Sequence, residues 1–360
     1  MNRQHPVVLA HAPVPDTCRA QGNFDLRMSP LLPKETTASM FTAFDGITDQ
    51  MQQVRDTIDK HLAESSGRIA VRSLLGTIGN HGGKMLRPGL VLLSGKACGQ
   101  ITDTHVCVAA MFEMIHRATL LHDDVIDEGR QRRGQPTVNN LHGNESAVLL
   151  GDFILARVFR MCAGLDHQVV TIIADAAVRT CEGELQQTTG RRNWALSESE
   201  YIDIITKKTA AIFSACCRAG ALLAGADRQT VSKLADFGLN IGIAFQIGDD
   251  LDDIVGEETQ AGKTLGSDLA KSKPTLALIH LLSVTDKSKK NALGQLLKSH
   301  PGNRNHLVEM LKTSGSLAYT RTQVREYAAK AVSLLETSKQ SNAKQALIGV
   351  ADFVAERGCL

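Results

Sequence analysis

The chain has 360 residues, of which 43% are hydrophobic and 22% are charged, and its formal net charge is +2. This composition is typical of a globular protein with one large core or two modest ones. The small net charge argues against a dedicated nucleic-acid binder, which carries a clear basic excess. No apolar run approaches the length of a membrane span, so we expect a chain that does not cross a bilayer.

The eight cysteines form neither CxxC pairs nor a dense framework of closely spaced residues. In a chain of this length, such cysteines are typical of reduced and mostly buried side chains. The cysteine pattern therefore predicts a cytoplasmic protein.

The first forty residues differ from the rest of the chain. They contain five of the nine prolines, and no helical period is visible among them. We interpret residues 1–39 as a flexible extension and residues 40–360 as one helical domain. The apolar stretch 7-VVLAHA-12 is too short for the hydrophobic region of a signal peptide, whereas a transit peptide stays open.

Helical periodicity dominates the chain after residue 40. Apolar residues at positions 44, 47, 51, 54, 58 and 62 form one helical stripe. Similar patterns predict helices over 101–128, 145–163, 166–187, 201–225 and 229–255. Ser197 and Glu200 have the spacing of a capping box, which would begin the helix that carries Lys208. The sequence thus predicts an all-α fold, a single helical bundle without internal repeats.

Two short acidic clusters stand out within these helices. In 123-DDVID-127 the aspartates are three and four residues apart, a spacing that places them on one helical face. The stretch 249-DDLDD-253 repeats the arrangement. The aspartates concerned are Asp123, Asp124, Asp127, Asp249, Asp250 and Asp253.

Carboxylate clusters of this kind suit Mg²⁺, which is usually held by one or two carboxylates together with substrate phosphates. Two clusters that face each other across a bundle would hold several ions around a diphosphate and make it a better leaving group. The alternative is that each cluster is a solvated acidic helix end. Both clusters directly follow apolar sequence and are followed by Lys or Arg, which favours a partly buried site.

The stretch 82-GGKMLRPG-89 adds a candidate anion site without a metal. It predicts Lys84 and Arg87 on the same side of a helix start, where backbone N–H groups also face an anion. A solvated basic turn is the alternative interpretation. One diphosphate held by metals and another held by basic side chains would mean two substrates.

Taken together, these stretches resemble the trans-type polyprenyl diphosphate synthases. The resemblance covers residues from about 60 to 357. It rests on 82-GGKMLRP-88, 116-HRATLLHDDVIDEGRQRRGQPTVN-139, 182-EGELQQ-187, 208-KTA-210 and 245-FQIGDDLDDIVG-256. It implies an all-helical homodimer that joins isopentenyl diphosphate to an allylic diphosphate, with Mg²⁺ as the cofactor.

The resemblance also implies roles for individual residues. Asp123, Asp127 and Asp249 would be the main Mg²⁺ ligands, supported by Asp124, Asp250 and Asp253. The diphosphate of isopentenyl diphosphate would be held by Lys84, Arg87, His116 and Arg133. The allylic diphosphate would be held by Arg132, Lys208, Thr209, Gln246, Lys263 and Lys273. Two departures from the family pattern are Ser272, where the family has glycine, and Ala277, where it has proline.

Two of these assignments have alternatives. His116 lies two helical turns before Asp123 on the same face, but a lone histidine on an apolar helix is often a core residue. Lys208 and Thr209 would be an ordinary exposed pair without the family pattern.

The segment 256-GEETQAGKTLG-266 would close over a dry site as a lid.

Product length is expected to depend on the residues that precede Asp123. Ala118 and Thr119, one turn earlier, are small, whereas short-chain members of the family carry an aromatic residue at the position of Ala118. Each open helical turn adds about 5.4 Å of tunnel. The tunnel floor would then be formed by Ile115 and Phe112, with Phe153 or Phe159 from a neighbouring helix. This predicts a long-chain product. Its release would need at most peripheral contact of the protein with a membrane. The alternative is that Ala118 only packs against another helix.

Three other functions compete with this prediction. A short- or medium-chain synthase would carry the same motifs. A class I terpene cyclase shares the first aspartate motif, but its second motif carries Asn or Asp, Ser or Thr, and Glu rather than a second DDxxD. A non-catalytic subunit of a heteromeric synthase typically loses an aspartate motif or the basic residues, and this chain keeps both.

Overall fold

The computed structural model describes residues 43–63, 74–76, 84–132, 134–255, 268, 271–286, 304–336 and 340–357. All of these residues belong to one compact unit, Leu31–Leu360. The predicted extension 1–39, the predicted lid 256–266 and the site candidates Arg133 and Lys263 lie outside the described residues.

Helices account for nearly all of the described structure, as the periodicity predicts. The N-terminal half contains the 3-10 turn η1 (Asp45–Ile47) and helices α2 (Thr48–Ala63), α4 (Leu86–Cys98), α5 (Asp103–Ile126), α6 (Val138–His142), α7 (Asn144–Cys162) and α8 (His167–Thr189). The second half contains α9 (Glu198–Ile205), the π-helical turn η2 (Thr206–Ala210), α10 (Ala211–Leu223), α11 (Arg228–Val255), α14 (Leu276–Val284), α16 (Arg304–Thr313), α17 (Ser316–Leu334) and α18 (Asn342–Arg357). The all-α prediction is therefore confirmed.

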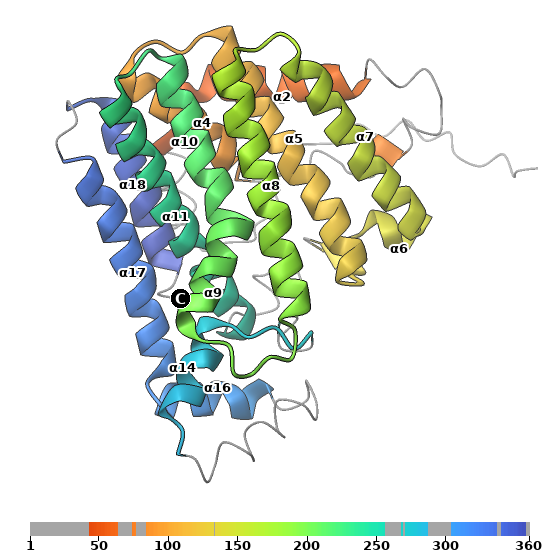
Figure 1. Ribbon diagram of the computed structural model, residues 1–360, viewed down its shortest axis with the longest axis vertical. Coiled ribbons are helices and arrows are strands. Elements are labelled where there is room, and N and C mark those ends of the chain that lie inside the picture. Colours follow the sequence, from red (N-terminus) through yellow and green to blue (C-terminus); the bar gives the residue numbers. More distant parts are fainter. Residues whose placement is uncertain are drawn as a thin grey trace, which may run out of the picture. The chain divides into compact units, whose positions relative to one another are not determined.

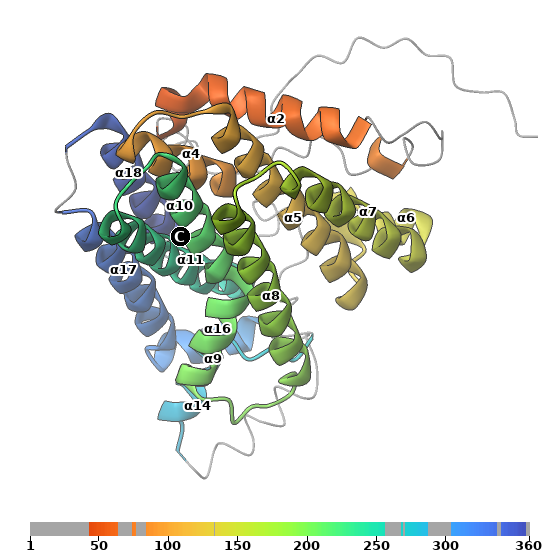
Figure 2. The same cartoon turned by 45° about the horizontal axis from the view of Figure 1, so that its top comes forward.

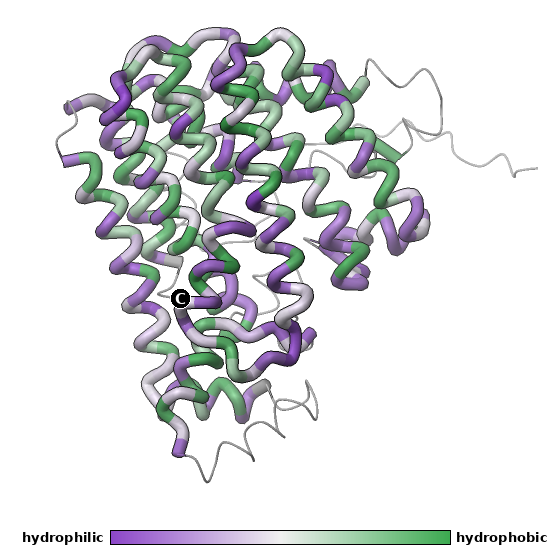
Figure 3. The backbone as a smooth tube through the Cα atoms, in the orientation of Figure 1, coloured by the Kyte–Doolittle hydropathy of each residue, from purple (hydrophilic) through white to green (hydrophobic). Residues whose placement is uncertain are grey.

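The long helices pack side by side into a bundle (Figures 1 and 2). α10 contacts α4, α8 and α11, while α5 lies between α4 and α7. Apolar and polar segments alternate along each helix, as expected for amphipathic helices with one buried stripe (Figure 3). Fully buried side chains such as Phe112, Phe213 and Phe237 belong to the main core.

Helix ends agree with the sequence in most places. Ser197 begins α9 with the predicted capping box, in which its side chain accepts from the N–H of Glu200. A two-stranded hairpin, β1 (Gln131–Arg132) and β2 (Gln135–Pro136), follows α5 and was not predicted. Its turn contains Gly134 at φ +75°, a conformation that glycine adopts without steric cost.

The segment from α9 through η2 to α10 is continuous but changes its winding in the middle. The π turn holds Lys208 and Thr209. A Cβ added to Gly183 on α8 would lie 2.3 Å from the backbone nitrogen of Lys208, and one added to Gly242 on α11 would lie 2.5 Å from the Cα of Ala210. The two glycines thus let α8 and α11 approach the π turn from either side.

Candidate active site

Both acidic clusters lie at the C-terminal ends of their helices. Asp123 and Asp124 are in the last turn of α5, and Asp127 follows the helix as its C-cap, with its N–H donating to the carbonyl of Asp123 at 2.8 Å. The second cluster occupies the last two turns of α11, which ends at Val255. The helix macrodipole is negative at this end, so carboxylates there are electrostatically unfavourable unless cations compensate them.

Arg132 compensates Asp124 through a two-pronged contact. Its Nε donates to Oδ1 and Oδ2 of Asp124 at 3.0 and 3.1 Å, and its Nη2 donates to Oδ1 at 2.8 Å. Asp124 is buried, so this charge-assisted contact also satisfies a carboxylate that water reaches poorly. The β1–β2 hairpin therefore positions a predicted diphosphate ligand directly on the first cluster.

Three cations converge on Asp127. Arg191 Nη2 lies 2.6 Å from its Oδ1, while Lys273 Nζ and Lys271 Nζ lie 2.9 and 3.2 Å from its Oδ2. Burial raises the pKa of Asp127, but Lys273 and Lys271 outweigh burial and hold this pKa below its usual value. Asp127 is therefore ionised and fully engaged with positive charge.

Asp123 has a different environment. Burial raises its pKa to about 6, although Lys208 and Arg132 oppose the shift. Lys208 contacts Glu184 on α8 and donates to Gln187 Oε1 at 2.7 Å. Burial lowers the pKa of Lys208, but Asp123 and Glu184 reverse this effect, so its pKa lies above the usual value. The π turn thus brings a firmly charged lysine beside Asp123.

The second cluster is tied into a hydrogen-bond chain. Thr209 donates to Gln246 Oε1 at 2.7 Å, and Gln246 Nε2 donates to Asp250 Oδ1 at 2.7 Å. The buried hydroxyl of Tyr201 donates to Asp250 Oδ2 at 2.7 Å. Burial, together with Asp268 and Asp249, raises the pKa of Asp250 to about 7. Both oxygens of Asp250 are therefore occupied by protein donors.

Lys273 and Asp268 connect the two clusters. Besides its contact with Asp127, Lys273 Nζ lies 3.9 Å from Asp268 Oδ1. The backbone N–H of Asp268 donates to Asp253 Oδ2 at 3.0 Å. The ends of α5 and α11 therefore face one site, in which carboxylates alternate with cations.

Lys84 and Arg87 flank the start of α4. Lys84 precedes α4, because Met85 adopts a left-handed conformation at φ +50° and the helix begins at Leu86. Lys84 Nζ lies 4.6 Å from the ring centroid of Phe353, and Arg87 Cζ lies 4.9 Å from that of Phe213. Lys84 therefore lies just before the helix and Arg87 in its first turn, and an aromatic face holds each side chain. His116 is half-buried on α5.

Several residues of the site were missed by the sequence analysis. Glu184 and Gln187 are inside the quoted stretch 182-EGELQQ-187, but nothing in their spacing assigned them a role. Arg191, Lys271 and Tyr201 also carry no local signal, because only the tertiary fold brings them to the aspartates.

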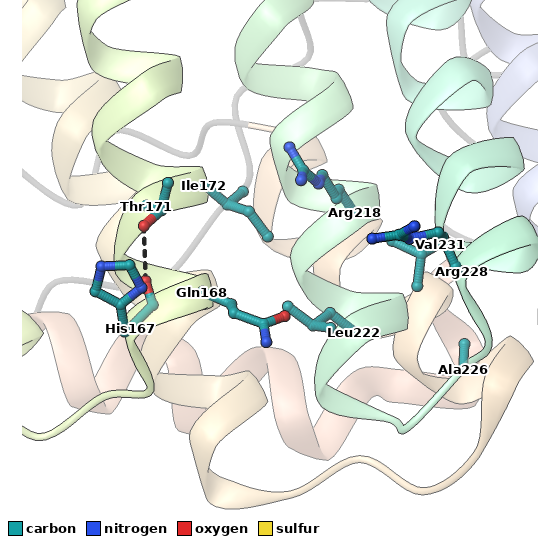
Figure 4. A pocket seen from close by; sticks show the side chains of 9 residues that line it. All are labelled: His167, Gln168, Thr171, Ile172, Arg218, Leu222, Ala226, Arg228 and Val231. Atoms are coloured by element: carbon teal, nitrogen blue, oxygen red, sulfur yellow. Dashed lines mark hydrogen bonds between the residues drawn. The ribbon is translucent and has the colours of Figure 1, made fainter.

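A separate pocket of about 400 Å³ lies between the N-terminal ends of α8 and α11 and the C-terminal end of α10 (Figure 4). It is lined by His167, Gln168, Thr171, Ile172, Arg218, Leu222, Ala226, Arg228 and Val231. About 26 Å of helix separate His167 from Glu184 at a rise of 1.5 Å per residue, so this pocket is not part of the carboxylate site.

Residues 70–314, more than half of the chain, match the family model described as polyprenyl synthetase. The chain belongs to this family. It is therefore an enzyme of the prenyltransferase class, as the motifs predict.

Relatives within the polyprenyl synthetase family include both long- and short-chain enzymes. The octaprenyl diphosphate synthase of Escherichia coli K12 is 37% identical over 281 residues, which cover 77% of this chain and 86% of the relative. The short chain isoprenyl diphosphate synthase of Methanothermobacter thermautotrophicus is 33% identical and covers 86% of this chain and 98% of its own. A crystal structure of polyprenyl synthase from Caulobacter crescentus, complexed with calcium and isoprenyl diphosphate, superimposes with a TM-score of 0.83 at 31% identity, over 88% of this chain and 97% of that one.

The two departures from the family pattern have different structural settings in this synthetase. Ser272 has φ +55°, a left-handed conformation that favours glycine, so serine is strained at this position. Ala277 is in the first turn of α14, where the backbone geometry is also compatible with proline. Ser272 therefore holds a backbone conformation that glycine would adopt without steric cost.

The proposed chain-length residues lie along α5 below the aspartates. Ala118, Ile115 and Phe112 are buried, and Thr119 is half-buried, with its Oγ1 donating to the carbonyl of His116 at 2.8 Å. Phe159 on α7 is 71% exposed, so the suggestion that it closes a tunnel inside this chain is wrong.

None of the described helices is long and apolar enough to cross a membrane.

Proposed function

We propose that this prenyltransferase extends an allylic diphosphate with isopentenyl diphosphate and releases a long-chain trans-polyprenyl diphosphate. The observation that supports this proposal best is the convergence of the two aspartate clusters and their cations at the ends of α5 and α11. The relative named octaprenyl diphosphate synthase and the small side chain of Ala118 support the long product.

Magnesium ions would be held by Asp123, Asp127 and Asp249. No group of three or more His, Cys, Asp or Glu residues forms a ready-made metal cage in the described part of the chain. Mg²⁺ generally uses one or two carboxylates and completes its shell with waters and substrate phosphates, so these donors fit an ion shared with a diphosphate. When bound, Mg²⁺ would neutralise charge that develops on the leaving diphosphate.

The residues around the allylic diphosphate would perform the ionisation step. Lys208, Lys273 and Arg132 lie beside the carboxylates and would withdraw charge from the allylic diphosphate. The C–O bond breaks, and its electron pair leaves with the diphosphate, which gives an allylic carbocation. The double bond of isopentenyl diphosphate then forms the new C–C bond, and a proton leaves to the released diphosphate.

Thr209 and Gln246 would orient this site rather than carry charge. Their hydrogen bond links the π turn to α11, so it fixes Lys208 relative to the second cluster. Lys84, Arg87 and His116 would hold isopentenyl diphosphate beside the first cluster. Arg133 and Lys263 keep their roles as proposals, since both lie outside the described residues.

A homodimer would cover apolar side chains that α7 and α8 expose. Leu149 and Phe159 on α7 are 68% and 71% exposed, and Val178 and Leu185 on α8 are 58% and 66% exposed. Exposed apolar groups of this size, here on two helices that follow each other in the chain, are typical of association surfaces. Sedimentation of the purified chain, compared with a Phe159→Glu variant, tests this. The six cysteines of the described part of the chain are not paired in disulfides, which supports the proposed cytoplasmic location.

Product analysis tests the proposed function directly. Purified protein is incubated with labelled isopentenyl diphosphate, farnesyl diphosphate and Mg²⁺, and the dephosphorylated products are separated by chain length. We expect a series that ends at a long polyprenol, and we expect Ala118→Phe to shorten it. A wild-type product that stops at geranylgeraniol would favour the short-chain alternative. Folded protein that extends no primer would favour a non-catalytic subunit.

A further inference from the structure

Two cations in the site have no role in the proposed function described so far. Arg191 lies in the loop after α8, and Lys271 precedes α14; both contact Asp127, at 2.6 and 3.2 Å. Their side chains are 27% and 26% exposed, so each reaches the solvent-accessible side of the site. The Nε of Arg191 is buried and has no hydrogen-bond partner among the described residues. One donor of this guanidinium is thus unsatisfied while Arg191 contacts Asp127.

The two loops that carry these cations are tied to each other. The N–H of Arg192 donates to the carbonyl of Ser272 at 2.9 Å. Both residues have left-handed backbones, with φ +65° and +55°. Non-glycine residues in this conformation store strain and often mark functional sites. Figure 1 shows the segment before α14, in cyan, crossing the lower end of α8. Arg191 and Lys271 are therefore presented to Asp127 as one unit.

The positive charges around Asp127 outnumber its single negative charge, which favours the binding of a further anion. Arg191, Lys271 and Lys273 place three positive charges on one carboxylate. A metal ion on Asp127 needs the same oxygen lone pairs and repels these cations. The neighbouring Asp124 is already paired with Arg132, so its charge is compensated and attracts cations that leave Asp127 less strongly. The anion that arrives with the metal is the diphosphate.

We infer that Arg191 and Lys271 are diphosphate-binding residues of the loaded enzyme, and that in the empty site they occupy the Asp127 oxygens that a metal ion takes. The inference rests on the proposed function, because it requires a metal and a diphosphate at this site. It extends the set of allylic diphosphate ligands by two residues outside the recognised motifs. When the metal ion and the diphosphate bind, Arg191 and Lys271 leave the carboxylate of Asp127 and contact the diphosphate beside it.

The inference predicts opposite effects of one substitution on two ligands. In Arg191→Gln, the dissociation constant of Mn²⁺ alone, followed by the EPR signal of the free ion, falls by about fivefold because a competing cation is lost. The dissociation constant of dimethylallyl S-thiolodiphosphate with Mg²⁺, measured by calorimetry, rises by about tenfold because a charged hydrogen bond is lost. In Lys271→Gln, the dissociation constant of Mn²⁺ likewise falls and that of the analogue likewise rises.

Arg192→Gln is the matched control. Arg192 is the adjacent residue and is exposed, and its side chain forms no hydrogen bond, ion pair or ring contact with any described residue, yet its loss changes the net charge equally. We expect no change in either constant. Arg191→Lys keeps the charge and restores most of the analogue affinity.

Two results would overturn the inference. Arg191→Gln could leave both constants unchanged, or it could weaken both, as a purely structural support of Asp127 would. A wild-type protein that binds neither Mn²⁺ nor the analogue would instead refute the proposed function, so the two failures are distinguishable.

Discussion

Gly183→Ala is the substitution from which the structure predicts the clearest separation of activity from stability. The added Cβ would lie 2.3, 2.7 and 2.8 Å from the N, Cα and Cβ atoms of Lys208. Normal contacts of this kind are about 3.5 Å or longer, so α8 and the π turn must separate by roughly 1 Å. This displacement moves the lysine that we place beside the allylic diphosphate.

The two consequences of this displacement differ in size. Overpacking costs about 1–3 kcal/mol of unfolding free energy. Alanine is a better helix former than glycine by about 1 kcal/mol, which offsets part of that cost. A misplacement of about 1 Å at a catalytic group lowers the rate by roughly 100-fold. We therefore expect a net destabilisation of about 0–2 kcal/mol together with a far larger loss of activity.

Urea unfolding and steady-state kinetics measure both quantities on the same protein. Gly164→Ala is the control, because a Cβ at Gly164 meets no atom within 4 Å. We expect the control to keep wild-type kcat and KM. A Gly183→Ala enzyme with wild-type kinetics would show that the π turn does not need the close approach of α8, and the reasoning would be wrong.

Three further predictions follow from single contacts. Thr209→Val leaves Gln246 Oε1 without its donor, so we expect a loss of about 1–3 kcal/mol in urea unfolding and a higher KM for the allylic diphosphate; unchanged values would contradict the hydrogen-bond chain. Ser272→Gly relieves a left-handed backbone, so we expect about 1 kcal/mol of stabilisation in urea, and a less stable variant would refute the strain. The raised pKa of Asp123, about 6, means that a proton competes with a metal ion below this pH. The affinity for Mn²⁺ alone is therefore expected to fall about tenfold per pH unit below pH 6, and Asp123→Asn is expected to make this fall less steep, since Asp250, whose pKa burial raises to about 7, still titrates.

The helices could be predicted from the sequence because their signals are local. The pattern over 229–255 is reproduced by α11, Arg228–Val255, and the capping box at Ser197 begins α9. Apolar spacing reports which face each helix buries, and that information needs no knowledge of the neighbours. The acidic clusters were found for the same reason.

Features that depend on tertiary contacts could not be predicted in this way. The π turn at Lys208 has no periodic signal, since it depends on the approach of two glycines from other helices. Lys84 looked like part of α4, but the left-handed Met85 separates it from the helix. Arg191 lies in a loop, where its sequence position says nothing about the carboxylate it meets.

The position of the aspartates suggests why so many cations gather around them. Carboxylates at the C-terminal ends of α5 and α11 oppose the helix dipoles, and burial raises the pKa of Asp123 and Asp250. The empty site therefore needs positive charge, which Arg132, Arg191 and Lys273 supply from loops and a hairpin rather than from the rigid helices. The carboxylates are on helices and the cations are on loops and a hairpin, so the inferred exchange, in which metal ions replace the cations at the carboxylates and the cations turn to the diphosphate, leaves the helices in place. If the cations were instead on helices of the core, they could leave the aspartates only if those helices moved, which would distort the core.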